Sequence, residues 1–187
     1  MKITTLLGSA RKKGNTASVL ERFESMAVTA GHEIDRIHIS NYQLKGCIGC
    51  DRCQSVMDTP GCIQKDDMLS IFERMIASDV IVYASPLYVW SFTAQLKTLI
   101  DRQYCLVKNY GTVEYKSFLK EKKVALLVTC GGEAEKNADL IPVIFKRESD
   151  FLGCVYLGTY VVPSCSTENP SGINSGATLH QMAEDIF

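Results

Sequence analysis

The amino-acid sequence predicts an α/β fold, in which a parallel β-sheet carries helices on both faces. Segments with the apolar pattern of strands alternate with segments of helical periodicity along the 187 residues. Two of the predicted strands contain VIVYA at 80–84 and VALLV at 124–128, which are apolar throughout. Strands buried on both faces have this composition, and they occur in parallel sheets whose connections are helices.

Local patterns define the elements of the first half. β-branched and apolar residues at 2–7 predict the first strand, and one-sided apolar periodicity at 16–30 predicts a helix. Alternating isoleucines at 33–39 predict the second strand. An irregular stretch at 41–65 then contains four cysteines. Two aspartates begin a helix at 66–77, and carboxylates are favourable at a helix N-terminus.

The second half continues the alternation of strands and helices. We expect strands at 80–84, 123–129 and 154–162, and helices at 92–106, 134–151 and 177–187. Pro142 lies inside the predicted helix at 134–151, so this helix should either be kinked or start late. Because no repeat, linker or low-complexity segment interrupts the chain, we expect one domain over 1–187, with 41–65 as a cysteine-rich loop insertion.

Composition excludes several classes of protein. Apolar residues make up 46% and charged residues 22%, which is unlike a disordered, collagen-like or coiled-coil chain. A net charge of −1 offers no basic excess to nucleic acid. No apolar run approaches the roughly 20 residues of a membrane span. The short N-terminal apolar run leads into a glycine turn rather than a signal-peptide cleavage site, so we expect a cytoplasmic protein with reduced cysteines.

The loop after the first predicted strand, GSARKKGNT at 8–16, has the composition of a phosphate-binding turn. Helix N-termini attract anions; Ser9, Asn15 and Thr16 can donate hydrogen bonds, and Arg11 can add positive charge. The loop lacks the lysine–serine ending of a nucleotide P-loop and the spacing of a dinucleotide fingerprint, so it indicates neither ATP nor Rossmann-bound NAD. The alternative is a plain loop in which Asn15 or Thr16 caps the helix.

Two other loops follow predicted strands at the same edge of the sheet. SPLYVWS at 85–91 places a tyrosine and the single tryptophan where they can stack on a flat ring, although both can instead bury against the next helix. TCGG at 129–132 has two glycines, which allow the backbone to approach a ligand closely. Together the three loops would enclose a phosphorylated flat heterocycle beyond the carboxyl ends of the strands.

The cysteines of the 41–65 stretch have a metal-site spacing. Cys47, Cys50, Cys53 and Cys62 follow the pattern C-x2-C-x2-C-x8-C. Three thiolates at every third residue can surround a compact cluster, with the fourth arriving from the end of the loop. Zinc sites usually draw on two separated pairs, so the triple favours iron–sulfur over zinc, while free or redox-active thiols are a further alternative. The remaining cysteines are scattered and predict packing residues, of which Cys130 can face the ligand: Cys105, Cys130, Cys154 and Cys165.

Taken together, these motifs resemble the flavodoxin-like, NAD(P)H-dependent FMN reductase family and, within it, the iron–sulfur flavoprotein branch. The matching segments occur in family order: GSARKKGNT at 8–16, CIGCDRC at 47–53, GCIQKDDM at 61–68, SDVIVYASPLYVWSFTAQLKTLIDR at 78–102 and TCGG at 129–132. The resemblance implies a flavodoxin-like three-layer fold with a five-stranded sheet and non-covalently bound FMN. The family often has proline where this chain has Ala10.

The resemblance also implies roles for individual residues. The FMN phosphate would be held by Ser9, Arg11, Asn15 and Thr16. The isoalloxazine ring would be lined by Pro86, Leu87, Tyr88, Val89 and Trp90, and its other side closed by Thr129, Cys130, Gly131 and Gly132. Lys97, Asp101 and Arg102 match the family as packing or subunit-contact residues. No catalytic side chain is expected, because the cofactor supplies the chemistry, and the three histidines are expected to be structural or surface groups.

By the same resemblance, the four loop cysteines imply a [4Fe–4S] cluster near the flavin. NAD(P)H would donate electrons, or ferredoxin in the iron–sulfur branch, and a quinone-like or other small molecule would accept them. A homodimer or homotetramer is implied as well. The alternative is a non-enzymatic, flavodoxin-like electron carrier, which a net charge of −1 argues against because such carriers tend to be strongly acidic. A zinc-stabilised binding module is a third hypothesis.

Overall fold

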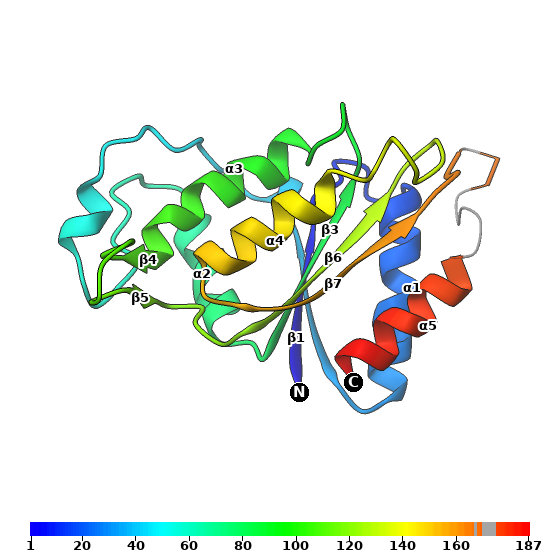
Figure 1. Ribbon diagram of the computed structural model, residues 1–187, viewed down its shortest axis with the longest axis horizontal. Helices are drawn as coiled ribbons and strands as arrows, with labels where there is room; N and C mark the ends of the chain where they lie inside the picture. The colour runs from blue at the N-terminus through cyan, green and yellow to red at the C-terminus, as the bar shows by residue number, and fades with distance from the viewer. Residues whose placement is uncertain (167, 170–174) are drawn as a thin grey trace.

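The computed structural model describes residues 1–166, 168–169 and 175–187 and contains the predicted α/β fold. Its main sheet has five strands in the order β2-β1-β3-β6-β7, and every neighbouring pair is parallel. Helices lie on both faces of this sheet (Figure 1). The strands are β1 (Lys2–Leu7), β2 (Glu33–His38), β3 (Val80–Pro86), β6 (Lys123–Thr129) and β7 (Val155–Val162).

Two hydrophobic cores hold the helices against the sheet. One core joins the sheet to α1 and α5 through residues such as Phe23 and Met182, and the other joins it to α2, α3 and α4 through Phe72, Leu96 and Phe145. Figure 1 shows these two groups on opposite sides of the sheet. The helices are α1 (Asn15–Thr29), α2 (Met68–Ile76), α3 (Ala94–Arg102), α4 (Ile141–Phe151) and α5 (Ser175–Ile186).

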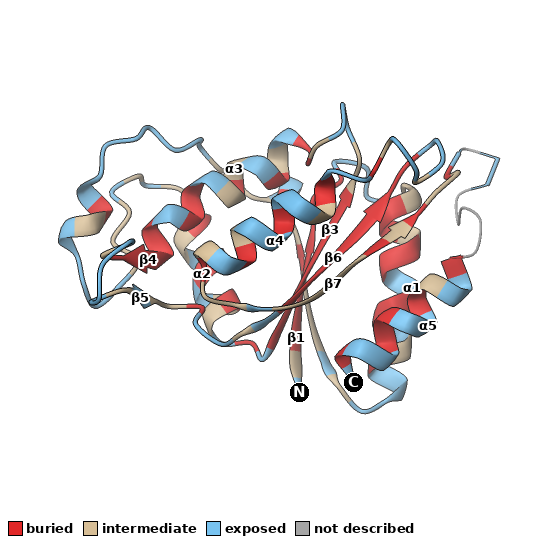
Figure 2. Cartoon of the chain, in the orientation of Figure 1, coloured by how far each residue is buried: buried red, intermediate tan, exposed pale blue. Residues whose placement is uncertain are grey.

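The central strands of the sheet are buried. In β3 and β6 the predicted apolar runs are buried along their whole length, as the buried colouring of the central strands in Figure 2 shows. The strand order reverses between β1 and β3, because β2 lies outside β1 on one side and β3 and β6 follow on the other. Ligands of open α/β sheets bind beyond the carboxyl ends of the strands at such a reversal.

Helix starts differ most from the predicted bounds. The helix expected over 134–151 begins at Ile141 with Pro142 in its first turn, so the late start is realised rather than the kink. The helix expected from residue 92 begins at Ala94, because Thr93 is its N-cap and accepts a hydrogen bond from Leu96 N at 3.3 Å. The start of α3 also approaches Gly8 so closely that a Cβ there would lie 2.9 Å from Leu96 Cβ.

Small elements that the sequence patterns did not predict support the cysteine-containing stretch. A two-stranded hairpin of β4 (Val107–Lys108) and β5 (Lys116–Ser117) follows α3, and a 3-10 helix, η2 (Arg52–Ser55), lies within the stretch itself. Two further 3-10 turns are η1 (Ile39–Asn41) and η3 (Gln103–Leu106).

In the described part of the chain, no helix combines the length and apolar character that crossing a membrane requires.

Candidate functional site

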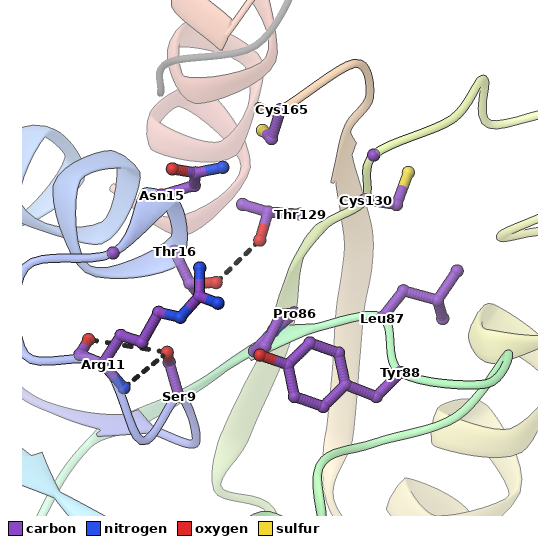
Figure 3. Close-up of a pocket in the computed structure, with 12 residues that line it drawn as sticks. Ser9, Arg11, Asn15, Thr16, Pro86, Leu87, Tyr88, Thr129, Cys130 and Cys165 are labelled. Atoms are coloured by element: carbon purple, nitrogen blue, oxygen red, sulfur yellow. Dashed lines mark hydrogen bonds between the residues drawn. The ribbon is translucent and has the colours of Figure 1, made fainter. Parts of the chain in front are cut away.

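A pocket of about 130 Å3 opens at the carboxyl edge of the sheet, beside the reversal of strand order. It lies between the loops that follow β1, β3 and β6, with one residue contributed by the segment after β7 (Figure 3). Its lining consists of Ser9, Arg11, Gly14, Asn15, Thr16, Pro86, Leu87, Tyr88, Thr129, Cys130, Gly131 and Cys165.

Most of the residues singled out from the sequence therefore meet at one place. Three do not line the pocket: Val89 and Trp90, which lie at the tip of the loop after β3, and Gly132. Conversely, Gly14 and Cys165 line it although the motifs did not single them out. Gly14 lay within the quoted phosphate-loop motif, whereas Cys165 reaches the pocket by tertiary folding, since its backbone N–H donates to Cys130 O at 2.9 Å.

The α1 end of the pocket is suited to an anion. Gly14 is the N-cap of α1 and supplies no side-chain oxygen, so no side-chain cap satisfies the N–H groups of the first turn. The Ser9 hydroxyl accepts a hydrogen bond from Arg11 N at 3.1 Å, which shapes the loop. The Arg11 side chain is exposed and extends beside the helix start (Figure 3). A helix N-terminus and a nearby guanidinium both attract negative charge.

Hydrogen bonds fix the loop after β1 to its neighbours. Thr16 Oγ1 and Thr129 Oγ1 lie 2.7 Å apart, which joins the start of α1 to the end of β6. The Gly8 carbonyl accepts from Thr93 Oγ1 at 2.7 Å. The His38 ring is 2.7 Å from the Ser9 carbonyl through Nε2, so this histidine braces the loop from the end of β2. No sequence pattern linked His38 to the loop, because the contact depends on the parallel pairing of β1 with β2.

The loop after β3 ends in a strained, exposed turn. Tyr88 and Ser91 exchange both backbone hydrogen bonds at 3.0 Å, and the residues between them, Val89 and Trp90, have φ values of 48° and 59°. Two positive φ values in succession are the mark of a type I′ turn, which glycine and asparagine favour and valine strongly disfavours. Val89 is 85% and Trp90 59% exposed. Strain retained at an exposed aromatic tip favours a binding role for this turn.

The wall of the pocket after β6 is neutral. Leu87 N donates to Thr129 O at 2.8 Å, and Cys130 N donates to Val162 O at 3.1 Å, so the loops after β3, β6 and β7 form one connected edge. Burial, with a smaller contribution from Glu133, raises the pKa of the Cys130 thiol. Burial likewise raises the pKa of Cys165, with Cys130 contributing next. Both thiols are therefore protonated packing groups rather than nucleophiles.

The cysteines with metal-site spacing gather around a second, separate cavity. Cys47 and Cys50 are exposed, Cys53 is buried and Cys62 is half-buried. All four line one cavity of about 30 Å3, together with Arg102, Tyr104 and Cys105 at the end of α3 and in η3. Among the described residues, no three histidine, cysteine or acidic side chains lie close enough together to hold a metal ion. The fold thus collects these cysteines around one cavity without placing their sulfur atoms in ligand geometry.

Two buried cations fix the cysteine loop to the scaffold. Arg102, which is 2% exposed, donates to both carboxylate oxygens of Asp66 and to the Lys45 carbonyl. Burial opposes ionisation of Asp66, but the hydrogen bonds from Arg102 and from the backbone N–H groups of Lys45 and Met68 outweigh it, and the pKa of Asp66 is lowered. The second cation is Lys108, whose ammonium donates to the carbonyls of Cys53 at 2.7 Å and Pro60 at 3.0 Å.

Helix α3 connects the two cavities. At its N-terminal end Thr93 bonds to the loop after β1, and at its C-terminal end Arg102 lines the cysteine cavity. Since α3 spans nine residues, its two ends are about 13 Å apart along the helix axis. They are distinct sites on a common support.

Comparison with known proteins finds a matching family and several relatives. Residues 1–164 match the family model described as NADPH-dependent FMN reductase. An iron–sulfur flavoprotein of Archaeoglobus fulgidus is 38% identical over 174 residues, which cover 91% of this chain and 75% of that protein. Another from Methanosarcina thermophila is 36% identical over 132 residues, 71% of this chain, but the match spans only 64% of the relative's length.

A solved structure with the same fold is an NAD(P)H:quinone oxidoreductase from Methanothermobacter marburgensis. It superposes with a TM-score of 0.75 over 98% of this chain and 93% of that chain, at 17% sequence identity. At this identity the likeness concerns the flavodoxin-like fold.

Proposed function

Because this chain belongs to the NADPH-dependent FMN reductase family, which the match over residues 1–164 shows, we propose that it is an FMN-dependent oxidoreductase. Its electrons would come from NAD(P)H or ferredoxin and pass to a quinone-like or other small acceptor. The observation that carries the proposal is the pocket at the uncapped start of α1, which is enclosed by the loops after β1, β3 and β6. We place this site in a single domain over 1–187, with 41–65 as an inserted loop.

In this proposal the α1 end of the pocket binds the FMN phosphate. Ser9, Asn15 and Thr16 line the pocket with hydroxyl and amide groups, the first-turn N–H groups add donors, and Arg11 supplies a full positive charge. His38 acts indirectly by bracing the Ser9 carbonyl. Each hydrogen bond to a charged acceptor contributes on the order of 1.5–3 kcal/mol, so this end would account for much of the binding free energy.

The flavin ring would lie toward the loop after β3. A pocket of about 130 Å3 is smaller than the roughly 300–1,000 Å3 of typical small-molecule sites, so a flavin would extend beyond it. Tyr88 is 50% exposed, and the exposed Val89–Trp90 turn lies next to it in the chain, so these aromatics are available to cover the ring. An open site of this kind favours completion by a neighbouring subunit, in line with a homodimer or homotetramer.

Bound FMN would supply the redox chemistry, since it accepts a hydride and can release its electrons singly. The chain's own residues would bind and orient it. Leu87 N and Thr129 O hold the loops on the two sides of the ring together, and the neutral Cys130 wall adds no charge that would compete with the flavin. No side chain of the pocket is assigned a covalent step.

We further propose that Cys47, Cys50, Cys53 and Cys62 hold a [4Fe–4S] cluster, as the names of the iron–sulfur flavoprotein relatives suggest. Support comes from the donor set: four thiols line one cavity next to two buried cations, and the loop carries glycines with positive φ at Gly49 and Gly61. The exposed Cys47 and Cys50 would have to move inward to join the others. The competing hypotheses are that these four cysteines bind zinc or that they remain free thiols.

Steady-state NAD(P)H oxidation by the FMN-loaded protein, with a quinone as acceptor, tests the function. A reductase should turn over many times, and both NADH and NADPH should be compared. A dedicated electron carrier should oxidise almost no nicotinamide under the same conditions while still exchanging single electrons with a reduced partner. Turnover no faster than that of free FMN would contradict the enzymatic proposal.

A further inference from the structure

Lys108 is a buried cation whose counter-ion is not apparent. Its side chain is fully buried, and its Nζ atom donates to the carbonyl oxygens of Cys53 and Pro60 at 2.7 and 3.0 Å. It also lies 5.9 Å from the centroid of the Phe118 ring. Throughout the described residues, no carboxylate oxygen comes within 4.0 Å of this ammonium.

A buried charge without an opposite charge is costly, so buried charges are generally paired, and an unpaired group shifts its pKa toward the neutral form. Burial accordingly lowers the pKa of the Lys108 ammonium. The neighbouring buried cation shows the contrast, because Arg102 is neutralised by Asp66 at 2.8 Å. The partners of Lys108 are neutral: the carbonyls of Cys53 and Pro60 and the Phe118 ring. An anion beside this lysine would therefore stabilise its charged form, and no carboxylate among the described residues pairs with it.

The position of Lys108 relative to the cysteines identifies the kind of anion. One of its carbonyl partners belongs to Cys53 itself, and the other lies two residues before Cys62. Cysteine side chains lose their protons when they bind a metal, so each sulfur ligand contributes a negative charge to the site. For four thiolates around a [4Fe–4S] core of charge +2, the net charge is −2 by simple addition of formal charges.

We propose that Lys108 is a positioning residue and the resident counter-ion of the cysteine site. Its ammonium holds Cys53 and the segment before Cys62 at the cavity, and its positive charge offsets the negative charge that the sulfur ligands acquire on binding metal. The proposal rests on the proposed function only in expecting that the cysteines bind a metal centre. In each binding event a cysteine S–H releases its proton to solvent and its sulfur forms a bond to the metal.

The hairpin that carries Lys108 also offers a matched control. Lys116 lies opposite Lys108 in the β4–β5 pair and donates to the Met57 carbonyl of the same loop at 2.9 Å. It is 5.3 Å from the same Phe118 ring. However, its side chain is 47% exposed and already lies near Asp58. Solvent screens such a charge, so its removal should scarcely affect an anion in the cavity.

The test compares Lys108→Gln, Lys108→Met and Lys116→Met in the full-length, FMN-loaded protein. Glutamine removes the charge but keeps an N–H donor, whereas methionine removes both and keeps the volume. The probe is Cd²⁺, titrated into reduced, chelator-treated protein and followed by its thiolate charge-transfer absorption. Iron, sulfide and FMN contents are measured on protein purified without oxygen, and retained FMN reports that the variant is folded.

Both Lys108 variants should bind Cd²⁺ at least about tenfold more weakly than wild type, since each loses a buried opposite charge. Their iron and sulfide contents should fall while FMN content stays unchanged, and Lys116→Met should match wild type. If Lys108→Met does not fold, Lys108→Gln alone decides the matter.

Other outcomes would overturn the proposal or separate it from the cluster hypothesis. Cd²⁺ affinity of Lys108→Gln within about twofold of wild type would show that its charge is irrelevant, because a buried ion pair contributes far more. An equal loss in Lys116→Met would show a general disturbance of the loop. Wild-type protein without iron but with the expected Cd²⁺ pattern would refute the cluster and leave the role of Lys108 standing. No Cd²⁺ binding by wild type would refute both.

Discussion

At the residue scale, Asn15 and Thr16 show how one short motif combines a structural and a binding role. Both are in the first turn of α1, where Gly14 provides no side-chain cap, and Thr16 also joins α1 to β6 through Thr129. The sequence predicted either a phosphate turn or a capped helix start. The residues of the motif were therefore predictable, but the contact with Thr129 was not, because it joins positions 113 residues apart.

The double variant Asn15→Ala/Thr16→Ala should reduce FMN affinity at least about tenfold, because each residue offers a donor to a charged acceptor worth on the order of 1.5–3 kcal/mol. Flavin fluorescence quenching on titration measures the dissociation constant. Ser25→Ala/Thr29→Ala is the matched control, since it removes two hydroxyls from the other end of the same helix. Unchanged FMN affinity in the first variant would refute the phosphate assignment.

Glu148 makes stability depend on pH. Both of its carboxylate oxygens are shielded from solvent without a hydrogen-bond partner among the described residues. Burial raises its pKa from 4.5 to about 8, against an opposing effect of Lys97. The folded state therefore binds the proton more tightly than the unfolded state, so the free energy of unfolding should fall as pH rises from about 4.5 to about 8.

Glu148→Gln should remove this dependence, because the amide stays neutral over the whole range. At pH 8 the variant should be more stable than wild type by on the order of 2–4 kcal/mol, and the two should converge near pH 4.5. Urea unfolding at several pH values provides the measurement. Parallel pH profiles for the two proteins would show that Glu148 is ionised in the fold or relaxed by water.

At the element scale, the strands were easier to predict than the starts of helices. The runs in β3 and β6 are apolar because both faces are covered, a condition that composition records directly. Helix α4 begins at Ile141, seven residues after the predicted position 134, because the chain before it is polar and Pro142 fits only a first turn. The β4–β5 hairpin has two residues per strand, too few for any periodicity.

The turn after β3 is an element whose strain can be relieved. Replacing Val89–Trp90 by Asn–Gly, the pair that type I′ turns favour, should stabilise the protein by about 1–2 kcal/mol. The same change removes the exposed Trp90 and should weaken FMN binding, since less aromatic surface can cover the ring. Thermal unfolding of the FMN-free protein and a parallel FMN titration separate the two effects. Lower stability in the variant would contradict the strain interpretation.

The cysteine loop is an element that should be separable from the sheet. Cys50 is exposed and lies beyond the strands, so Cys50→Ala should abolish iron and sulfide incorporation while FMN content and thermal stability persist. Ile48→Ala, also exposed in the same loop, is the control and should retain iron. Iron and sulfide analysis of protein purified without oxygen provides the readout. Loss of FMN together with iron in Cys50→Ala would contradict the separation of the two sites.

At the scale of the whole molecule, the parallel sheet explains why distant motifs act together. Segments near residues 9, 87 and 130 meet because all the main strands end at the same edge, and this much follows from the alternation of strands and helices. Which side chains line the pocket does not follow: Cys165 enters it, whereas Val89 and Trp90 project outward. The buried pairing of Lys108 with the loop carbonyls likewise depends on tertiary contacts that no motif encodes.

The most direct test of the central claim is to compare the affinities of the wild-type protein for FMN and for riboflavin, which lacks the phosphate. The claim is that the uncapped start of α1, with Ser9, Arg11, Asn15 and Thr16, is a phosphate site. Several charge-assisted hydrogen bonds should then make FMN bind at least about a hundredfold more tightly than riboflavin. Equal affinities for the two flavins, or no binding of FMN, would contradict the account.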